Sequence, residues 1–269
     1  MSLIQALILG IVQGLSEFLP VSSDGHLVLF PFIVGWKEPS LAFIVSAHIG
    51  TLAALLWVFR ARIVEVVRAV LGASGREPDR KLAWLIVIGT IPGAAIGGVF
   101  SSQIESTFDR PVVAALLLGV TGWALLAAET AFEEREAEPR SEEQITRADA
   151  GLIGLAQATA ILPGISRSGT TIATGLFRGI SREAAARFSF LLAIPITIGA
   201  IIFEIPDMLD EGTSGSGGAM VIGILAAAVT GVVAIQAMLG LVRRRGLRPF
   251  GVYCFFAMTA GLLTALARG

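Results

Sequence analysis

Long stretches without a charged residue divide this chain of 269 residues and constrain its fold more than any other feature. Five runs of 18 to 31 consecutive residues contain no Asp, Glu, Lys or Arg, and a sixth, at 188–203, is only slightly shorter. A helix of about 20 apolar residues is long enough to cross a lipid bilayer. The runs and their apolar flanks predict six transmembrane helices, at residues 41–59, 82–101, 112–131, 184–205, 219–241 and 249–267.

The composition agrees and excludes other classes of protein. Only 15% of the residues are charged and 54% are hydrophobic, whereas a soluble domain has about 25% charged residues. So little charge excludes an intrinsically disordered chain, and a net charge of −1 gives no electrostatic footprint for nucleic acid. One cysteine and two histidines exclude a disulfide framework and a Cys- or His-rich metal cluster. We therefore expect an all-α polytopic membrane protein that does not bind nucleic acid.

Two further apolar regions, 3–35 and 150–178, are each interrupted by a polar centre that contains Pro and Gly. The halves on either side are about 10–14 residues long, too short to span a bilayer. Broken helices are tolerated at membrane depth where they are buried in protein or line a wet cavity. Both regions are therefore predicted to be re-entrant helical hairpins. A signal peptide over residues 1–30 is disfavoured, because it lacks a basic start and Glu17 interrupts its apolar segment.

The two hairpins align with each other when the sequence is shifted by 144 positions. The shift matches Gly10, Gln13, Ser22 and Gly25 with Gly154, Gln157, Ser166 and Gly169. The chain then divides into two repeats, 1–149 and 150–269, and each contains one re-entrant hairpin followed by three transmembrane helices. An odd number of crossings in the first copy inverts the second. We therefore predict an inverted-topology repeat, an architecture known from transporters.

The basic residues predict the orientation in the membrane. Sixteen of the 20 lie in the segments 60–81, 132–149, 178–187 and 242–248, which alternation places on one side. Only Lys37, Arg110 and Arg268 lie on the other side. Cytoplasmic loops carry the excess of Lys and Arg. This distribution predicts a multi-pass protein of the cytoplasmic (inner) membrane with both termini extracytoplasmic.

Arg167 is the one basic residue outside the loops and termini, and it lies at the centre of the second hairpin. Glu17, Asp24 and His26 lie at the matching centre of the first hairpin. Ionisable groups at membrane depth are costly and indicate a functional site. The inverted repeat should bring the two centres together. The alternative is a buried ion pair that only locks the hairpins to each other.

Hydroxyl groups surround both centres at the start of a half-helix. Free N–H groups at a helix N-terminus, with hydroxyls and one Arg, are suited to phosphate oxygens. The alternative for each serine is an ordinary N-cap. The candidate phosphate-binding residues are Ser22, Ser166, Ser168, Gly169 and Thr171.

A phosphate ester or diphosphate would bring two or three negative charges to a site that already contains Glu17 and Asp24. Only Arg167 opposes them, so a divalent cation such as Mg²⁺, held by the two carboxylates and the phosphate, would balance the charge. Glu17 is the candidate metal ligand or base. His26 is the candidate proton shuttle or nucleophile, and Ser23 is a rival nucleophile.

Two polar residues have less certain roles. Gln13 lies four residues before Glu17 on the same helix face, where it either supports the site or closes the helix packing. His48 lies in the middle of an uncharged run. We expect His48 to have a hydrogen-bonded structural role or to line a cavity.

Three segments resemble a known family, the integral-membrane undecaprenyl-diphosphate phosphatases, also called bacitracin-resistance proteins. They are QGLSEFLPVSSDGH from Gln13, LPGISRSG from Leu162 and FSFLLAIP from Phe188. The resemblance runs over the full length. It implies conversion of undecaprenyl diphosphate to undecaprenyl phosphate and inorganic phosphate, which recycles the lipid carrier for peptidoglycan and other envelope polymers and gives bacitracin resistance.

The resemblance also implies a set of site residues and a cofactor. Glu17 matches the essential acid of the family, His26 its histidine, and residues 166–168 its Ser-Arg-Ser. Family activity needs Mg²⁺ or Ca²⁺, and the family site opens to the extracytoplasmic side. Asp24 stands where the family usually has Ser or Thr, so its role is left open between a metal ligand and a partner of Arg167.

Another phosphatase family and a transporter are the alternatives to this assignment. The type-2 phosphatidic acid phosphatases also use a Gly-His pair, but their Ser-Arg-x5-His-x3-Asp motif would require His and Asp where this chain has Ala173 and Phe177. A lipid-carrier flippase or anion transporter would suit the same inverted-repeat site. The expected partners are a polyprenyl diphosphate substrate and membrane lipid, and a homodimer is compatible with the sequence.

Overall fold

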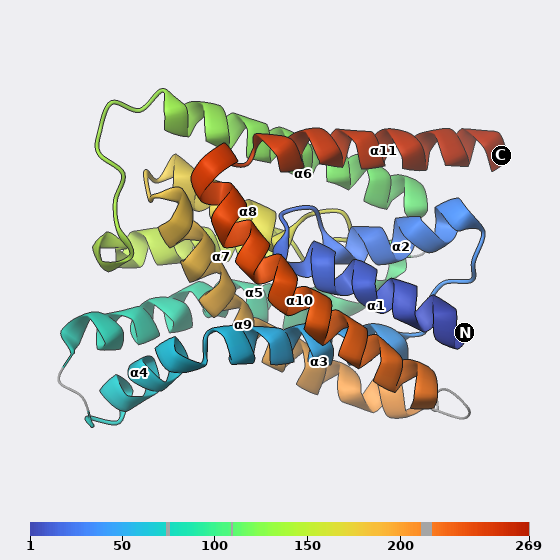
Figure 1. Cartoon of the computed structure of the whole chain (residues 1–269), viewed down its shortest axis with the longest axis horizontal. Coiled ribbons are helices and arrows are strands. Elements are labelled where there is room, and N and C mark those ends of the chain that lie inside the picture. The colour runs from blue at the N-terminus through green and yellow to red at the C-terminus, as the bar shows by residue number, and fades with distance from the viewer. Residues whose placement is uncertain (74–75, 109, 211–216, 269) are drawn as a thin grey trace.

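A computed structural model describes residues 1–73, 76–108, 110–210 and 217–268, and this part of the chain is helical without a strand (Figure 1). The prediction of an all-α protein is confirmed. The helices are α1 Leu3–Phe18, α2 Ser23–Val34, α3 Leu41–Val58, α4 Arg60–Val70, α5 Glu77–Phe108, α6 Pro111–Glu133, η1 Glu142–Gln144, α7 Arg147–Thr159, α8 Arg167–Phe177, α9 Arg182–Asp210, α10 Gly217–Arg245 and α11 Arg248–Arg268.

Six of these helices, α3, α5, α6, α9, α10 and α11, are long and apolar enough to cross a membrane. They correspond one by one to the six predicted spans. Large hydrophobic side chains on their outer surfaces are exposed, including Trp57, Val229 and Phe256. In water such a surface would be unfavourable, but lipid tails accept it without cost. The chain is therefore a multi-pass membrane protein.

Helix α4 was not expected, because residues 60–81 are rich in charge and were assigned to a loop. Within that segment, Ile63, Val66 and Val70 recur at the spacing of one helix face, and Ile63 and Val66 pack against the core. The apolar stripe explains why a short amphipathic helix forms here.

The two predicted hairpins are present as pairs of short helices. Helices α1, α2, α7 and α8 have 16, 12, 13 and 11 residues. The chain reverses at Ser22, whose φ is 66°, and at Gly164, whose φ is 101°. A positive φ costs little for glycine but is uncommon for serine. The first turn is therefore held by other contacts, which the site supplies.

Both chain termini lie at one end of the long axis, and α4 lies at the opposite end (Figure 1). The four Arg-rich segments join helix ends on the α4 side. Ion pairs hold this end together: Arg140 and Arg178 both contact Asp149 at 2.8 Å. Burial opposes ionisation of Asp149, but hydrogen bonds from the two arginines outweigh it and hold the pKa of this carboxyl well below its usual range.

Each hairpin packs against a long helix of the other predicted repeat. Gly10 of α1 lies against Gly223 of α10, and Gly154 of α7 lies against Gly89 of α5. A Cβ atom at Gly10 or Gly154 would overlap the facing backbone. Gly10 and Gly154 are corresponding positions under the shift of 144, and α5 and α10 are each the second transmembrane helix of their predicted repeat. The inversion and the repeat boundaries stay predictions.

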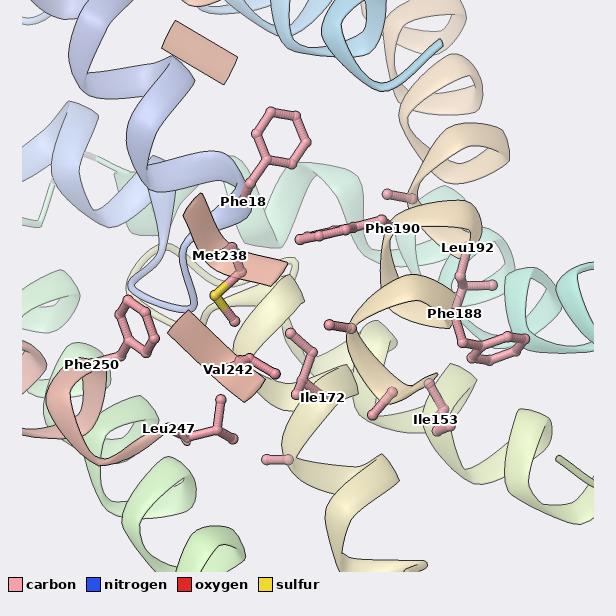
Figure 2. Packing of buried hydrophobic residues seen from close by; sticks show 14 of the residues in the cluster. Phe18, Ile153, Ile172, Phe188, Phe190, Leu192, Met238, Val242, Leu247 and Phe250 are labelled. Atoms are coloured by element: carbon pink, nitrogen blue, oxygen red, sulfur yellow. The ribbon is translucent and has the colours of Figure 1, made fainter. Parts of the chain in front are cut away.

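Part of the core lies where α1, α8, α9 and α10 meet (Figure 2). Phe18 packs edge-to-face on Phe190, with ring centroids 5.8 Å apart. Ile172 and Met238 fill the space beside them and are fully buried. Phe18 is the last residue of α1, so this packing holds the end of the first hairpin helix next to Glu17 in a defined position.

Candidate active site

The tips of the two hairpins touch each other. Gly164 donates its backbone N–H to the Oγ of Ser22 at 3.1 Å, and Ser168 donates its hydroxyl to the carbonyl of Leu19 at 3.1 Å. Ser22 also caps α2 by accepting the N–H of Gly25. The predicted convergence of the two polar centres is confirmed, and the contacts to Ser22 account for its unusual backbone conformation.

Glu17 is the centre of a buried hydrogen-bond network. Arg167 donates to its Oε1 at 2.5 Å, and Ser23 donates its hydroxyl to Oε2 at 2.5 Å. Gln13 donates its side-chain amide to the same Oε2 at 3.1 Å. Four of the predicted site residues are thus connected. Hydrogen bonds to an ionised carboxylate in a dry environment are strong, so this network orders both hairpin tips.

Arg167 has donor capacity left over. Its Nη2 binds Glu17, whereas its Nη1 is buried and has no hydrogen-bond partner within the described part of the chain. A guanidinium has five N–H donors in a fixed plane that matches phosphate oxygens. A buried donor without a partner is costly, so this atom indicates a ligand with acceptor oxygens.

His48 lies closer to the carboxylates than the sequence suggested. Its Nε2 is 3.7 Å from Asp24 Oδ1 and 3.8 Å from Glu17 Oε2, and its Nδ1 donates to the carbonyl of Ile44 at 3.0 Å. The expectation that His48 is hydrogen-bonded or lines a cavity is confirmed. Its approach to two carboxylates was missed, although a lone histidine within an uncharged run was a signal.

His26 faces away from this network. Its Nδ1 is 2.8 Å from the carbonyl of Ser22, and its Nε2 is 2.8 Å from the hydroxyl of Tyr253 on α11. The imidazole also stacks on the Tyr253 ring, with centroids 5.6 Å apart. The structure therefore does not bring His26 to Glu17, Asp24 and Arg167.

The predicted phosphate-binding residues divide into two groups. Ser22 and Ser166 line the cavity described below. Ser166 is also the N-cap of α8, accepting the N–H of Gly169 at 3.0 Å, so the alternative of an ordinary cap is present as well. Ser168 and Thr171 are buried in helix packing, and Thr171 shares a hydrogen bond with Ser189.

A cavity of about 750 Å³ adjoins the hydrogen-bond network around Glu17. Its volume is typical of small-molecule sites. The polar end is lined by Glu17, Ser22, Ser23, Asp24, His48, Ser166 and Arg167. Other wall residues come from α2, from the end of α7, from the start of α3 and from the second halves of α5 and α9. The start of α3 and the second halves of α5 and α9 lie toward the end of the molecule that carries the termini. The site can thus hold an anionic group at its base and an apolar group above it.

The polar end of the cavity supplies oxygen atoms that a divalent cation could bind. Glu17, Asp24 and the Ser23 hydroxyl supply hard oxygen atoms of the type that Mg²⁺ and Ca²⁺ prefer. No group of three His, Cys, Asp or Glu side chains in the described part of the chain is arranged to hold a metal. The residues therefore fit a cation that takes its remaining ligands from phosphate and water.

Comparison with known proteins gives consistent matches. Residues 6–260 match the family model described as bacitracin resistance protein BacA. Undecaprenyl-diphosphatase 2 of Stutzerimonas stutzeri is 42% identical over 94% of both chains. The undecaprenyl-diphosphatases of Pelobacter propionicus and Moorella thermoacetica are 41% and 40% identical, over 96% and 99% of this chain and 95% and 97% of their own lengths.

Proposed function

Because this chain belongs to the BacA family of bacitracin resistance proteins, we propose that it is an integral-membrane undecaprenyl-diphosphate phosphatase. It converts undecaprenyl diphosphate to undecaprenyl phosphate and inorganic phosphate. The carrier lipid is thereby returned to cell-envelope synthesis, and bacitracin resistance follows. The observation that supports this most is Arg167, which lines the cavity, pairs with Glu17 and has a buried Nη1 without a hydrogen-bond partner among the described residues.

Arg167 binds the terminal phosphate in this proposal. Its free Nη1 and the hydroxyls of Ser22 and Ser166 donate to phosphate oxygens, and their donor strength matters most as negative charge increases in the transition state. The attacking oxygen forms a bond to the terminal phosphorus, and the bond from phosphorus to the bridging oxygen breaks. Undecaprenyl phosphate is the leaving group.

In this proposal Glu17 and Ser23 take part in the attacking step. The Ser23 hydroxyl donates to Glu17 Oε2, so this carboxylate is positioned to accept the proton of Ser23 or of a water in its place. Both nucleophiles remain open. A phosphoserine intermediate forms on Ser23 only if its hydroxyl attacks phosphorus, so mass spectrometry of protein quenched during turnover distinguishes them.

Of the two histidines, His48 is assigned to the reacting side of the site. Its ring lines the cavity within 4 Å of two carboxylates, whereas His26 is paired with Tyr253. His26 remains the residue that the family resemblance implies. Comparison of the two alanine variants, described in the Discussion, decides between them.

The cofactor in this proposal is Mg²⁺ or Ca²⁺. Asp24, with Glu17, would hold it beside the phosphate, where it would neutralise charge on the phosphate oxygens. Asp24 is suited to this role because its carboxylate lines the cavity and is partly exposed.

The proposed location is the cytoplasmic membrane, with the Arg-rich end inside and both termini outside. The cavity then faces the extracytoplasmic side. This orientation is measured by labelling single cysteines, introduced at Lys37 and at Arg244, with a membrane-impermeant maleimide in intact cells. Labelling at position 37 alone supports it, and labelling at position 244 alone contradicts it.

The activity is tested with purified protein and undecaprenyl diphosphate in detergent. Release of inorganic phosphate that stops with a chelator and returns with Mg²⁺ is the expected result. A parallel flux assay in vesicles addresses the flippase alternative, which the names of the relatives do not favour. Flux of the lipid without any phosphate release would overturn the proposal.

A further inference from the structure

We propose that the isoprenoid tail of the substrate lies between the outer halves of α5 and α9 and reaches the bilayer through the opening between them. This inference rests on the proposed function, because it concerns the tail of the same lipid diphosphate. It names a subsite for the apolar part of the substrate, separate from the polar residues that bind phosphate.

The two helices approach each other closely at Gly89 and Gly93 of α5. A Cβ at Gly89 would lie 2.9 Å from Leu192, and a Cβ at Gly93 would lie 3.3 Å from Ile196. Proline interrupts both helices at this level, with Pro92 in α5 and Pro195 in α9. Proline removes a helical hydrogen bond and bends helices.

Beyond this level the space between the helices is open. Gly98 of α5 and Gly199 of α9 both line the cavity, and a Cβ at either would meet no atom within 4 Å. Both glycines and Phe203 are exposed although they belong to the cavity wall. The cavity therefore extends from Arg167 to exposed residues of α5 and α9.

Gln157 is a buried polar residue in the wall of this cavity. Its side chain is only 3% exposed, and its Nε2 donates to the carbonyl of Gly89 at 3.4 Å. Its Oε1 lacks a hydrogen-bond partner in the described part of the chain, although the residue lines the cavity beside Gly93. A buried acceptor of this kind needs a donor from water or a ligand.

Five apolar residues line one part of this cavity, Ile161, Ile196, Ala200, Ile201 and Phe203, and Thr197 and Glu204 line it as well. The only part of a polyprenyl diphosphate that matches such a wall is its hydrocarbon chain. With the diphosphate at Arg167, the chain must leave the cavity on a route that avoids exposing it to water, and the opening between α5 and α9 supplies that route.

The open glycines allow a specific test. Gly98→Phe and Gly199→Phe add a ring at positions where the new Cβ would meet no atom within 4 Å, so each should fold and narrow the opening. Gly240→Phe is the matched control, since Gly240 of α10 also has open space around it but lies outside the cavity. Activity is compared on undecaprenyl diphosphate and on farnesyl diphosphate, which has the same head group and a short tail.

The expected result is a fall of at least about tenfold in kcat/KM for undecaprenyl diphosphate in both cavity variants, with activity on farnesyl diphosphate retained. Gly240→Phe should behave like the wild type on both substrates. Unchanged hydrolysis of the long substrate by both cavity variants would overturn the tail subsite, as would an equal loss on both substrates. If the wild type itself hydrolyses neither, the proposed function fails instead.

A second variant avoids any folding defect. Gly199→Cys is purified in its folded form and its activity is measured before and after alkylation with a long-chain maleimide, with Gly240→Cys as the control. Cys254 is buried, so it should not react. Loss after alkylation that is confined to the long substrate and to position 199 supports the subsite. No loss at position 199 contradicts it.

Discussion

Arg167 and Glu17, separated by 150 positions in the sequence, form an ion pair with Nη2 and Oε1 2.5 Å apart. The pair joins the end of α1 to the start of α8, and thus one hairpin to the other. Because Ser23 and Gln13 already satisfy the other oxygen of Glu17, the contact is fully formed without a substrate. One pair therefore holds the two hairpins together, and it leaves Arg167 Nη1 buried without a hydrogen-bond partner among the described residues.

The first prediction separates these two roles. Glu17→Gln leaves Arg167 buried without its counter-charge, so the free energy of unfolding should fall by about 3 kcal/mol and phosphate release should stop. The double variant Glu17→Gln/Arg167→Gln removes both charges and should recover much of the lost stability, but no activity. Thermal unfolding in detergent and phosphate release measure the two effects. Recovery of activity in the double variant would mean that the pair is only a structural lock.

The second prediction concerns the two histidines. His48→Ala should lower kcat by more than about tenfold, because it removes the ring that faces Asp24 and Glu17. Tyr253→Phe removes the hydroxyl that pairs with His26 and should leave kcat near the wild-type value. His26→Ala should have a smaller effect than His48→Ala. The reverse order would return the reacting role to His26.

The third prediction concerns the cation. Asp24→Asn should raise the Mg²⁺ concentration needed for half-maximal phosphate release by about tenfold or more, with the fold intact. A titration of Mg²⁺ against activity, and of Mg²⁺ against the unfolding temperature, provides two readouts. Glu38→Gln is a suitable control, because Glu38 also lines the cavity but belongs to the segment just before α3 and not to a hairpin. Identical titrations for wild type and Asp24→Asn would remove Asp24 from the metal site.

The fourth prediction is a dependence of stability on pH at the Arg-rich end. Asp149 has a lowered pKa in the folded protein, so its ion pairs contribute fully above its unfolded pKa of about 4 and are lost as the pH falls toward the folded value. Asp149→Asn should cost about 1–3 kcal/mol at pH 7 and should flatten the fall in unfolding temperature below pH 4. An unchanged unfolding temperature at pH 7 would contradict it.

The spans and hairpins could be predicted because the bilayer imposes them. A segment without charge has to be long enough to cross, and a polar break such as Pro163-Gly164 in a short apolar region has to be buried in protein. The convergence of Glu17 and Arg167 followed from the same rule, since few charges are tolerated at that depth, but the rule did not decide whether Glu17 or Asp24 pairs with Arg167. Helix α4 was missed because its apolar stripe is short and lies among arginines.

The finer geometry of the site depends on how separate helices are placed. Whether His26 or His48 faces Glu17 is decided by the rotation of α2 and by the distance from α3 to the hairpin tip. Neither quantity is encoded in a local pattern. The stacking of His26 on Tyr253 joins residues 227 positions apart, and it excludes His26 from the cavity in a way that no motif could reveal.

The most direct measurement of the central claim is phosphate release from undecaprenyl diphosphate by purified Arg167→Ala. Arg110→Ala is the control, because Arg110 is an exposed arginine at the start of α6. Both variants are first checked for a folded state by thermal unfolding. The account predicts a loss of at least about 100-fold for Arg167→Ala and none for Arg110→Ala. Normal phosphate release by folded Arg167→Ala would contradict it.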